Sequence, residues 1–383
     1  MNILYFILPA FLMIIVSIYL YYYIARAISI SKINVKKKRV KLTIIAIVII
    51  IMYFSLRDLG VGVVAVLHII TISLLMDLIN YIFKLVGRRR NITYYKWKIV
   101  YNSGIVPIIV SVIILAYGYW NMNNIVESDY MIYTNKDIRE EGYRVAMISD
   151  LHYGTVMNSE KLQKACAEIE KSAPDMVVLC GDIVDEKTNL EQMQEVAEIL
   201  GSIKSKFGVF YVYGNHDDAR YSSIPSYTKG ELWNELSSNN IRVLVDQSYE
   251  INDEFIIIGR DDEGFSKEEG RKSSEDLIAN IDKNKFILLL DHQPSNLDEN
   301  SFLGYDLQLS GHTHKGQIWP CGLISELFNF NELEYGYEKI GNYEVIVSSG
   351  ISGWNYPIRT GSKSEYLIVD IKNKVWKIII MKF

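Results

Sequence analysis

Five short segments of this 383-residue chain hold the residue types best suited to bind metal ions. In chain order they are Asp150-Leu-His152, Gly181-Asp182-Ile-Val-Asp185, Gly214-Asn215-His216-Asp217, Asp291-His292 and Gly311-His312-Thr-His314. The chain has six histidines, and all except His68 occur in these segments. Imidazole and oxygen ligands without thiolate suit manganese, iron, zinc or cobalt, and they do not suit copper or an iron–sulfur cluster. The segments therefore predict a site for divalent metal ions.

Two such ions held side by side could hydrolyse a phosphate ester. The reaction needs neutralised phosphate oxygens and a water molecule that is nucleophilic near neutral pH, and two ions about 3.5–4 Å apart supply both. Ions this close require a shared anionic ligand, and a carboxylate can bridge them. Glycines before Asp182, Asn215 and His312 allow tight turns and close backbone approach.

Each of the five segments directly follows a predicted β-strand. Short β-branched runs alternate with helical stretches at Ser159–Lys171 and Leu190–Lys204, an order typical of a parallel or mixed sheet covered by helices. Because the carboxyl ends of the strands in such a sheet share one edge, where ligands bind, we expect the segments to meet there. The predicted strands are Tyr143–Ser149, Met176–Cys180, Val209–Tyr213, Phe255–Gly259, Phe286–Leu290, Leu307–Ser310, Tyr343–Ser348, Tyr366–Asp370 and Val375–Met381, the last two forming a hairpin around Lys372–Lys374.

The first third of the chain has the composition of a membrane domain. Residues 1–122 contain 14 basic and two acidic residues, a net charge of +12, whereas the remainder has 26 basic and 43 acidic residues, a net charge of −17. Apolar runs that could cross about 30 Å of hydrocarbon predict an all-α transmembrane bundle of about four helices. The runs are Ile3–Ala25, Leu42–Leu56, Leu59–Phe83 and Ile99–Trp120. We therefore expect a transmembrane domain at 1–122, a linker at 123–142 and a globular domain at 143–383.

The basic loops predict how the bundle is oriented. Seven basic residues lie from Arg26 to Lys41, and six lie from Lys84 to Lys98. The positive-inside rule places both loops in the cytoplasm, so the protein is expected to be a multi-pass protein of the cell membrane with its acidic domain extracytoplasmic. His68 and Asp77 lie in the third run and could serve function or helix packing.

Composition also excludes several classes of protein. An acidic globular domain disfavours nucleic acid as the main partner, because phosphate backbones bind basic surfaces. Cys166, Cys180 and Cys321 are far apart and form no CxxC pair, so the chain encodes neither a disulfide framework nor a cysteine zinc site.

The ordered set of segments resembles the motifs of calcineurin-like metallophosphoesterases, from about Tyr143 to the C-terminus. A membrane bundle followed by such a domain is similar to the membrane-linked subgroup that includes the YkuE-like and YaeI-like proteins. The stretches Gly311–Ile318 and Pro357–Arg359 also fit this subgroup, whereas Lys315 stands where a glycine is expected. The resemblance implies a two-sheet β-sandwich flanked by helices, two divalent ions, and hydrolysis by attack of metal-bound hydroxide on phosphorus.

The resemblance also implies a role for each matching residue. His216 would protonate the leaving oxygen, with Asp185 as its preferred orienting partner and Asp217 as the alternative. Arg359 could bind a phosphate oxygen, and Lys315 could add a cation beside the metals, although ordinary surface salt bridges are the alternative for both. The first metal would be held by Asp150, His152, Asp182 and His314, and the second by Asp182, Asn215, His292 and His312, with Asp182 as the bridge.

The resulting hypothesis is a membrane-anchored enzyme that hydrolyses a phosphodiester or pyrophosphate bond in a lipid-linked or envelope substrate. Its expected partners are that phosphate ester and the lipid bilayer, with no nucleic acid and no obligate protein partner. One alternative is a phosphodiesterase or phosphomonoesterase for soluble nucleotides, with the helices as a passive anchor, which a truncation from Asp137 onward would test. The other is a non-catalytic metal-binding scaffold, which replacement of His216 would test.

Overall fold

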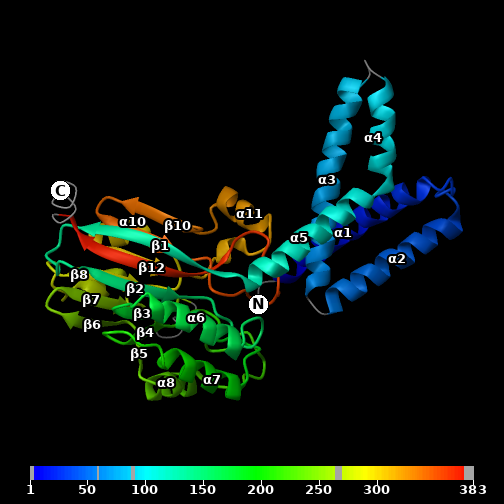
Figure 1. Ribbon diagram of the computed structural model, residues 1–383. Coiled ribbons are helices and arrows are strands. Elements are labelled where there is room, and N and C mark those ends of the chain that lie inside the picture. The colour runs from blue at the N-terminus through cyan, green and yellow to red at the C-terminus, as the bar shows by residue number, and fades with distance from the viewer. Residues whose placement is uncertain (1–3, 58–59, 88–90, 264–269, 375–383) are drawn as a thin grey trace. The chain divides into compact units, whose positions relative to one another are not determined.

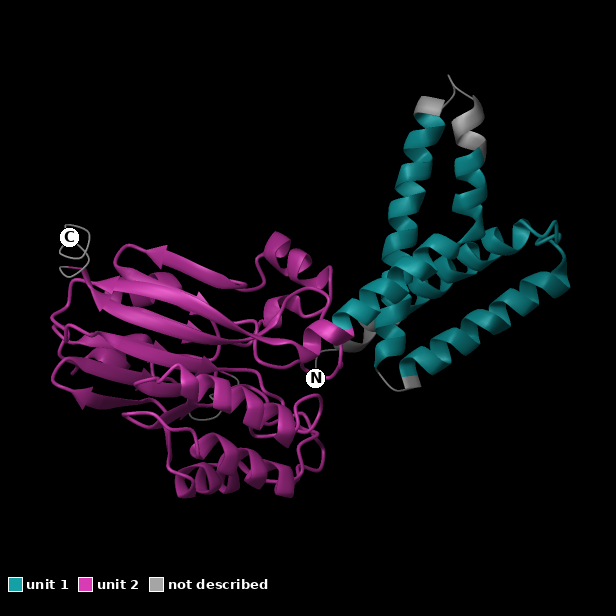
Figure 2. Ribbon diagram, in the orientation of Figure 1, with its two compact units in different colours: residues 1–118 teal, residues 119–383 magenta. Residues whose placement is uncertain are grey.

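The protein folds into two compact units (Figure 2). The computed structural model describes residues 4–57, 60–87, 91–263 and 270–374. The first unit contains residues 1–118 and the second contains residues 119–383. The boundary falls inside the fifth helix, so its last residues, from Tyr119 onward, belong to the second unit.

The first unit is built of helices, four of which could span a membrane. Among the described residues, the spans that are long and apolar enough are Phe11–Ser29, Lys38–Leu56, Val61–Leu85 and Ile105–Asn123. This confirms the prediction of about four membrane helices. The helices are α1 (Leu4–Ser29), α2 (Lys38–Arg57), α3 (Val61–Gly87), α4 (Asn91–Ser103) and α5 (Ile105–Asn123).

The prediction that Ile99–Trp120 is one helical run is wrong. Gly104 has a φ of +66° and separates α4 from α5. Pro107 then lies in the first turn of α5, where its missing N–H removes no intrahelical hydrogen bond. The fourth span therefore begins at Ile105, and the start of the predicted run belongs to α4.

The ionisable residues of α3 have partners within the bundle. Asp77 forms an ion pair with Arg26 of α1 at 2.5 Å and accepts hydrogen bonds from Tyr19 at 2.6 Å and Tyr101 at 2.7 Å. His68 is buried, and its Nδ1 lies 2.8 Å from the carbonyl oxygen one turn earlier. The contacts of Asp77 join α3 to α1 and α4, whereas the hydrogen bond of His68 lies within α3.

The second unit is a sandwich of two six-stranded sheets with helices on both outer faces (Figure 1), which confirms the expected fold class. The strand order is β1-β12-β2-β3-β4-β5 in one sheet and β10-β11-β9-β8-β7-β6 in the other. The strands β2, β3, β4 and β5 are parallel neighbours, as are β7, β8, β9 and β11. The carboxyl ends of these two parallel sets carry the five segments described above.

The elements of the second unit follow the sequence pattern closely. The strands are β1 (Ile125–Thr134), β2 (Tyr143–Ile148), β3 (Met176–Cys180), β4 (Val209–Val212), β5 (Ile241–Val243), β6 (Gln247–Asn252), β7 (Phe255–Gly259), β8 (Phe286–Leu290), β9 (Leu307–Ser310), β10 (Gly336–Ile340), β11 (Tyr343–Val347) and β12 (Ser364–Asn373). The helices are α6 (Ser159–Lys171), α7 (Leu190–Gly201), α8 (Lys229–Ser238), α9 (Ser274–Ile278), α10 (Leu297–Leu303) and α11 (Cys321–Phe328), with a short 3-10 turn η2 (His314–Gly316).

Three apolar layers hold this unit together. Side chains such as Val178 and Leu288 fill the space between the two sheets. A second layer packs the outer face of the first sheet against α6, α7 and α8, and a third packs the second sheet against α9 and α10. Central strands are buried on both faces, which is why β3 and β8 are uninterrupted apolar runs.

Two expectations about the ends of the globular domain need correction. Residues 123–142, expected as a linker, include the ten-residue strand β1, which pairs in parallel with β12 along its whole length. The sequence does not indicate β1 because the polar residues Glu127, Ser128 and Asp129 are typical of a loop. β12 continues to Asn373, so Lys372 is part of a strand and not of a turn, and the expected strand Val375–Met381 lies outside the described residues.

Candidate metal centre

The five predicted segments meet at one edge of the sandwich. They follow β2, β3 and β4 in the first sheet and β8 and β9 in the second. Hydrogen bonds join them across the two sheets: His292 Nδ1 lies 2.8 Å from the carbonyl oxygen of Cys180, and the backbone N–H of His312 donates to Asp150 at 2.9 Å. The sandwich therefore brings together residues that are far apart in the sequence.

The backbone of these segments is held in an unusual conformation. Asp150, His152, Asp182, His312 and His314 all have φ between 44° and 72°, in the left-handed region. Each such residue costs of the order of 1–3 kcal/mol, and such strain gathers at functional sites. The fold thus accepts strain at the positions where Asp and His side chains converge.

The first group of ligand atoms comes from Asp150, His152 and His314. One side-chain atom of each lies within 4.8 Å of the others. The Nε2 atoms of the two histidines are 3.2 Å apart, and His314 Nε2 lies 3.5 Å from Asp150 Oδ1. The second oxygen of this carboxylate, Oδ2, is buried and has no hydrogen-bond partner among the described residues.

The second group comes from Asp182, His292 and His312, again within 4.8 Å of one another. His292 Nε2 is 3.1 Å from Asp182 Oδ2, and Asn215 Oδ1 is 2.8 Å from His312 Nδ1. The same oxygen of Asp182 lies 3.9 Å from Nε2 of His152 in the first group. The Asp182 carboxylate therefore lies between the two groups.

Gly181 is required for this close packing. Its φ is +76°, and a Cβ atom at this position would lie 2.5 Å from His292 Nδ1 and 2.7 Å from the backbone of Gly214. Contacts this short cannot be accommodated without moving backbone. Only glycine lets the loops after β3, β4 and β8 approach one another here.

The pKa values of His314 and His292 are shifted in opposite directions by burial and neighbouring charges. Burial lowers the pKa of His314 well below its usual value, and the neighbouring His152 and Arg359 add to the effect. Burial also lowers the pKa of His292, but the Asp182 carboxylate more than offsets this and raises it well above its usual value. A positive charge is thus favoured beside Asp182, and a divalent cation would satisfy that need as a proton does.

The donor set fits two divalent cations. It offers imidazole nitrogens, carboxylate oxygens and one amide oxygen, and the carboxylate of Asp182 faces both groups. The buried Asp150 Oδ2, which has no hydrogen-bond partner in the described part of the chain, is an atom expected of a metal ligand. The three cysteines take no part, since Cys180 contributes only its backbone carbonyl.

Asp217 organises the loops around Asp182. Its carboxylate accepts hydrogen bonds from the backbone N–H groups of Asp182, Ile183, Val184 and Gly214, at 2.6–3.1 Å. It does not contact the ring of His216 through any hydrogen bond within the described chain. Its role is therefore to hold the bridging segment in place, and the prediction that it could orient His216 is wrong.

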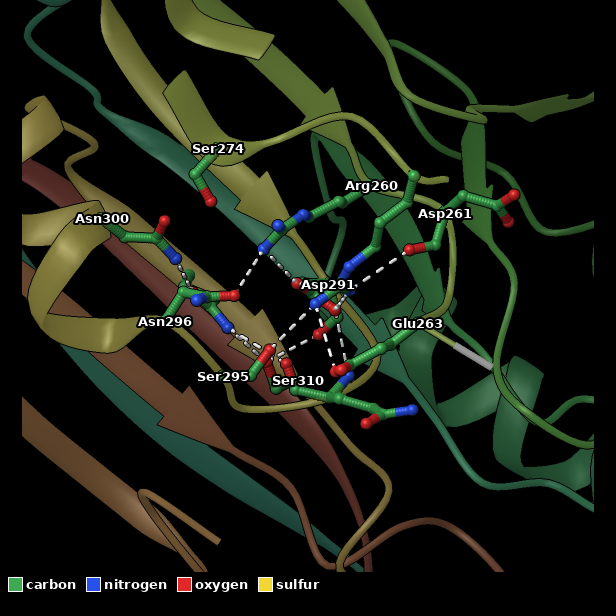
Figure 3. A network of polar contacts seen from close by, with 12 residues as sticks. Arg260, Asp261, Glu263, Ser274, Asp291, Ser295, Asn296, Asn300 and Ser310 are labelled. Atoms are coloured by element: carbon green, nitrogen blue, oxygen red, sulfur yellow. Dashed lines mark hydrogen bonds and ion pairs between the residues drawn. The ribbon is translucent and has the colours of Figure 1, made fainter. Parts of the chain in front are cut away.

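A second buried carboxylate, Asp291, fixes the loop that carries His292 (Figure 3). Arg260 and Arg271 each approach its Oδ2 to 3.4 Å, and its backbone carbonyl accepts a hydrogen bond from Ser310 at 2.6 Å. Burial raises the pKa of Asp291 to about 6, and the two arginines act against that rise. This network joins the loops after β7, β8 and β9.

His216 has a different partner from the one predicted. Its Nδ1 lies 2.8 Å from Oε1 of Glu186. Asp185, the preferred candidate, instead places Oδ2 3.4 Å from Nδ1 of His152, so it can orient a metal ligand. Burial lowers the pKa of His216, but the Glu186 hydrogen bond and the charge of Asp182 more than offset this, so that the pKa is raised.

Arg359 differs from expectation, and Lys315 has an aromatic neighbour. Arg359 is fully buried, and its Nη1 donates to the carbonyl oxygen of Lys363 at 2.9 Å, so it cannot present a fork to a phosphate. It lies behind His314, with Nη2 3.5 Å from Nδ1 of that ring. Lys315 places its ammonium 4.3 Å from the centre of the Tyr335 ring, a cation–π contact.

Two aromatic rings lie beside His216. The ring of Tyr221 lies 5.1 Å from His216 and that of Trp354 lies 5.4 Å from it, measured between centroids. Both rings are exposed. They place exposed aromatic surface beside the candidate proton donor.

Sequence reasoning missed two features of the site. Glu186 was overlooked because it directly follows Asp185, and the spacing alone does not show which of two adjacent carboxylates faces His216. Arg260, Asp261 and Asp262 follow β7 in the same manner as the five segments follow their strands, and Asp262 is buried. The rule that ligand residues follow strands would have found this sixth segment.

A two-sheet sandwich with two adjacent His/Asp groups at the carboxyl edge of its strands is the arrangement expected of a hydrolase that binds two divalent ions. Residues 143–316 match the family model described as calcineurin-like phosphoesterase. The chain therefore carries a calcineurin-like metallophosphoesterase domain and is a metal-dependent phosphoester hydrolase, as the sequence predicted.

Relatives in other organisms share this domain. The chain is 29% identical over 271 residues to an uncharacterized metallophosphoesterase of Aquifex aeolicus, covering 69% of this chain and 98% of the relative. It is 26% identical over 239 residues to YkuE of Bacillus subtilis, an uncharacterized metallophosphoesterase, covering 61% and 80%. A transmembrane protein with metallophosphoesterase domain from Danio rerio is 27% identical over 245 residues, covering 60% of this chain and 53% of that protein.

Proposed function

We propose that the protein hydrolyses a phosphodiester or pyrophosphate bond in a lipid-linked or cell-envelope substrate. Two divalent ions would be held by Asp150, His152, Asp182 and His314 on one side and by Asp182, Asn215, His292 and His312 on the other. The observation that carries the proposal is the position of Asp182 Oδ2, 3.1 Å from His292 Nε2 and 3.9 Å from His152 Nε2. A shared carboxylate is what a two-ion site requires.

The chain's own residues then have defined tasks. Bound divalent ions at such a site neutralise phosphate oxygens and lower the pKa of water. His216 would give its proton to the leaving oxygen, which separates from phosphorus as the alcohol or phosphate product. Glu186 at Nδ1 keeps the ring oriented and favours its protonated form. Asp185 and Arg359 position the rings of His152 and His314.

Two features favour an apolar, membrane-associated substrate. The chain carries four helices able to span a bilayer. The rings of Tyr221 and Trp354 beside His216 would contact the group that leaves with the proton, and aromatic rings suit a bulky or apolar group better than a bare hydroxyl. From the basic loops we further propose that the hydrolase domain faces the outside of the cell membrane.

The test is turnover by the purified full-length chain on a panel of soluble monoesters, soluble diesters, nucleotides and lipid-linked diesters and pyrophosphates. We expect the lipid-linked esters to be cleaved with the highest kcat/KM. The Asp182→Asn variant should be inactive, whereas Asp298→Asn, which changes an exposed carboxylate in α10, should match the parent. Cleavage of soluble esters with no turnover of lipid-linked ones would overturn the substrate proposal.

The passive-anchor alternative needs a truncation chosen from the fold. A chain that starts at Asp137 would lose β1 and leave the edge of β12 unpaired. A chain that starts at Tyr119 retains the whole second unit. If that form cleaves soluble nucleotides as fast as the full-length chain and neither cleaves lipid-linked esters, the helices are only an anchor.

A further inference from the structure

The helix α11 has its apolar side turned away from the protein. The side chains of Leu323, Ile324, Leu327 and Phe328 are all exposed, with Leu327 74% and Phe328 65% accessible. In a helix of 3.6 residues per turn, these positions lie on one face. A helix of a soluble domain normally buries such a face, so this one needs a partner.

The residues on the opposite face of α11 prevent the helix from rotating to bury its apolar side. Gly322 is buried, and a Cβ atom there would lie 2.5 Å from the carbonyl oxygen of Lys315. Ser325 donates a hydrogen bond to Glu334 at 2.7 Å. The side that contacts the domain is thus made of a glycine and a serine, which fixes the apolar face outward.

The last turn of α5 lies in the same unit as α11 and near it. Asn121 donates to the carbonyl oxygen of Arg359 at 3.0 Å, and Ser364 donates to the carbonyl oxygen of Met122 at 3.1 Å. The segment between these contacts is bound to the stretch of chain that leads into α11, because the N–H of Thr360 donates to the carbonyl oxygen of Gln317 at 2.9 Å. Figure 2 shows this end of α5 in the colour of the second unit.

These contacts keep the start of α11 close to the end of the membrane span. The span Ile105–Asn123 must leave the hydrocarbon near Tyr119 and Trp120, whose exposed rings are typical of the headgroup region. Asn121, next to that exit point, donates to Arg359, and the following residue, Thr360, accepts a hydrogen bond from the N–H of Trp319, two residues before α11. The start of α11 is therefore linked by hydrogen bonds to the residues at which the span Ile105–Asn123 ends.

We propose that α11 is an interfacial membrane helix, with Leu323, Ile324, Leu327 and Phe328 inserted among lipid acyl chains. A helix of this kind lies in the plane of the interface, about 5–10 Å deep. The helix α11 begins shortly after His312 and His314 in the chain. Its insertion would therefore hold the metal-centre edge of the sandwich close to the lipid surface. The proposal concerns a contact surface and does not depend on which phosphoester is cleaved.

The experiment uses a cysteine that the chain already has. Cys321 in the first turn of α11 is exposed, whereas Cys166 and Cys180 are buried. The full-length protein, labelled at Cys321 with a polarity-sensitive fluorophore, is placed in lipid nanodiscs with and without nitroxide on the acyl chains. We expect the nitroxide lipids to quench roughly half of the fluorescence or more, as for a probe within the acyl-chain boundary.

The control is a label on an equally exposed apolar residue of the same unit. Phe302 in α10 is 91% exposed and precedes β9, so it lies at the opposite edge of the sheet. In the Phe302→Cys/Cys321→Ser variant, nitroxide lipids should leave the fluorescence unchanged. A second label at Leu327→Cys in the Cys321→Ser background should behave like Cys321. Equal, weak quenching at positions 321, 327 and 302 would overturn the proposal, and would show that α11 binds a protein surface or faces water.

Discussion

At the residue scale, two neighbouring carboxylates that look equivalent in the sequence have different partners in the fold. Asp185 lies against His152, a proposed metal ligand, and Glu186 lies against His216, the proposed proton donor. Their substitution should therefore affect different steps. The two variants test the roles independently of each other.

We expect Glu186→Gln to lower kcat while leaving metal content unchanged. The loss should be about 10–100-fold, the size seen when an outer partner of a catalytic group is removed. His216→Gln should cost more, about 10²–10⁴-fold, and the double variant should be no slower than His216→Gln. Steady-state kinetics and metal analysis of the three proteins provide the measurement, and additive losses would contradict the pairing.

Asp185→Asn should weaken metal binding instead. Loss of the carboxylate beside His152 Nδ1 is expected to reduce metal affinity about 10–100-fold. Activity should then return at higher metal concentration, which metal titration followed by turnover would show. A variant that binds metal normally and stays slow at saturating metal would place Asp185 in catalysis and overturn this assignment.

At the element scale, the loops are shaped by backbone constraints that few side chains could meet. Gly181 combines a left-handed φ with near contact to two other loops. The strands β3, β4 and β8 can deliver their residues to one point only because this position lacks a Cβ.

Gly181→Ala should abolish binding at the Asp182, His292 and His312 group. Gly208 is the matched control, because it also has positive φ, +92°, but no heavy atom lies within 4 Å of the place that a Cβ would occupy. Gly208→Ala should cost only the backbone strain, about 1 kcal/mol or slightly more, and keep its metal. Metal content and thermal unfolding in detergent would be compared, and equal behaviour of the two variants would refute the close-approach argument.

Much of this element-level arrangement could be predicted from the sequence, for identifiable reasons. Buried parallel strands such as Met176–Cys180 are continuous apolar runs, and their carboxyl ends must share an edge, so the convergence of Asp150, Asp182 and His292 could be expected. The strand β1 could not be predicted from the sequence, because its polar residues are typical of a loop although it pairs with β12. The burial of Arg359 and the choice between Asp185 and Glu186 depend on how loops fold back, which spacing does not encode.

At the scale of the whole molecule, a hydrolase domain and a set of membrane helices share one chain. The contact of Asn121 with Arg359 and Ser362 shows that the end of α5 is an integral part of the second unit. Arg359 in turn lies behind His314. Within the second unit, the end of α5 is therefore linked through Arg359 to the support of the metal centre.

The proposed orientation predicts which positions react with a membrane-impermeant thiol reagent in intact cells. In the Cys321→Ser background, Ile224→Cys in the hydrolase domain should be labelled, and Lys36→Cys in the first basic loop should react only after the cells are permeabilised. Ile224 is 84% exposed, so its accessibility to the reagent depends on sidedness alone. The reverse pattern would put the domain in the cytoplasm.

The most direct test of the central claim is the electron paramagnetic resonance spectrum of the full-length protein loaded with Mn²⁺, taken together with metal content. A bridging Asp182 predicts two ions per chain and a spin-coupled signal, since ions that share a carboxylate lie about 3.5–4 Å apart. Asp182→Asn should lose the coupled signal, and Asp298→Asn should keep it. A single isolated Mn²⁺ signal in the parent protein, or a coupled signal that survives Asp182→Asn, would contradict the shared-carboxylate site.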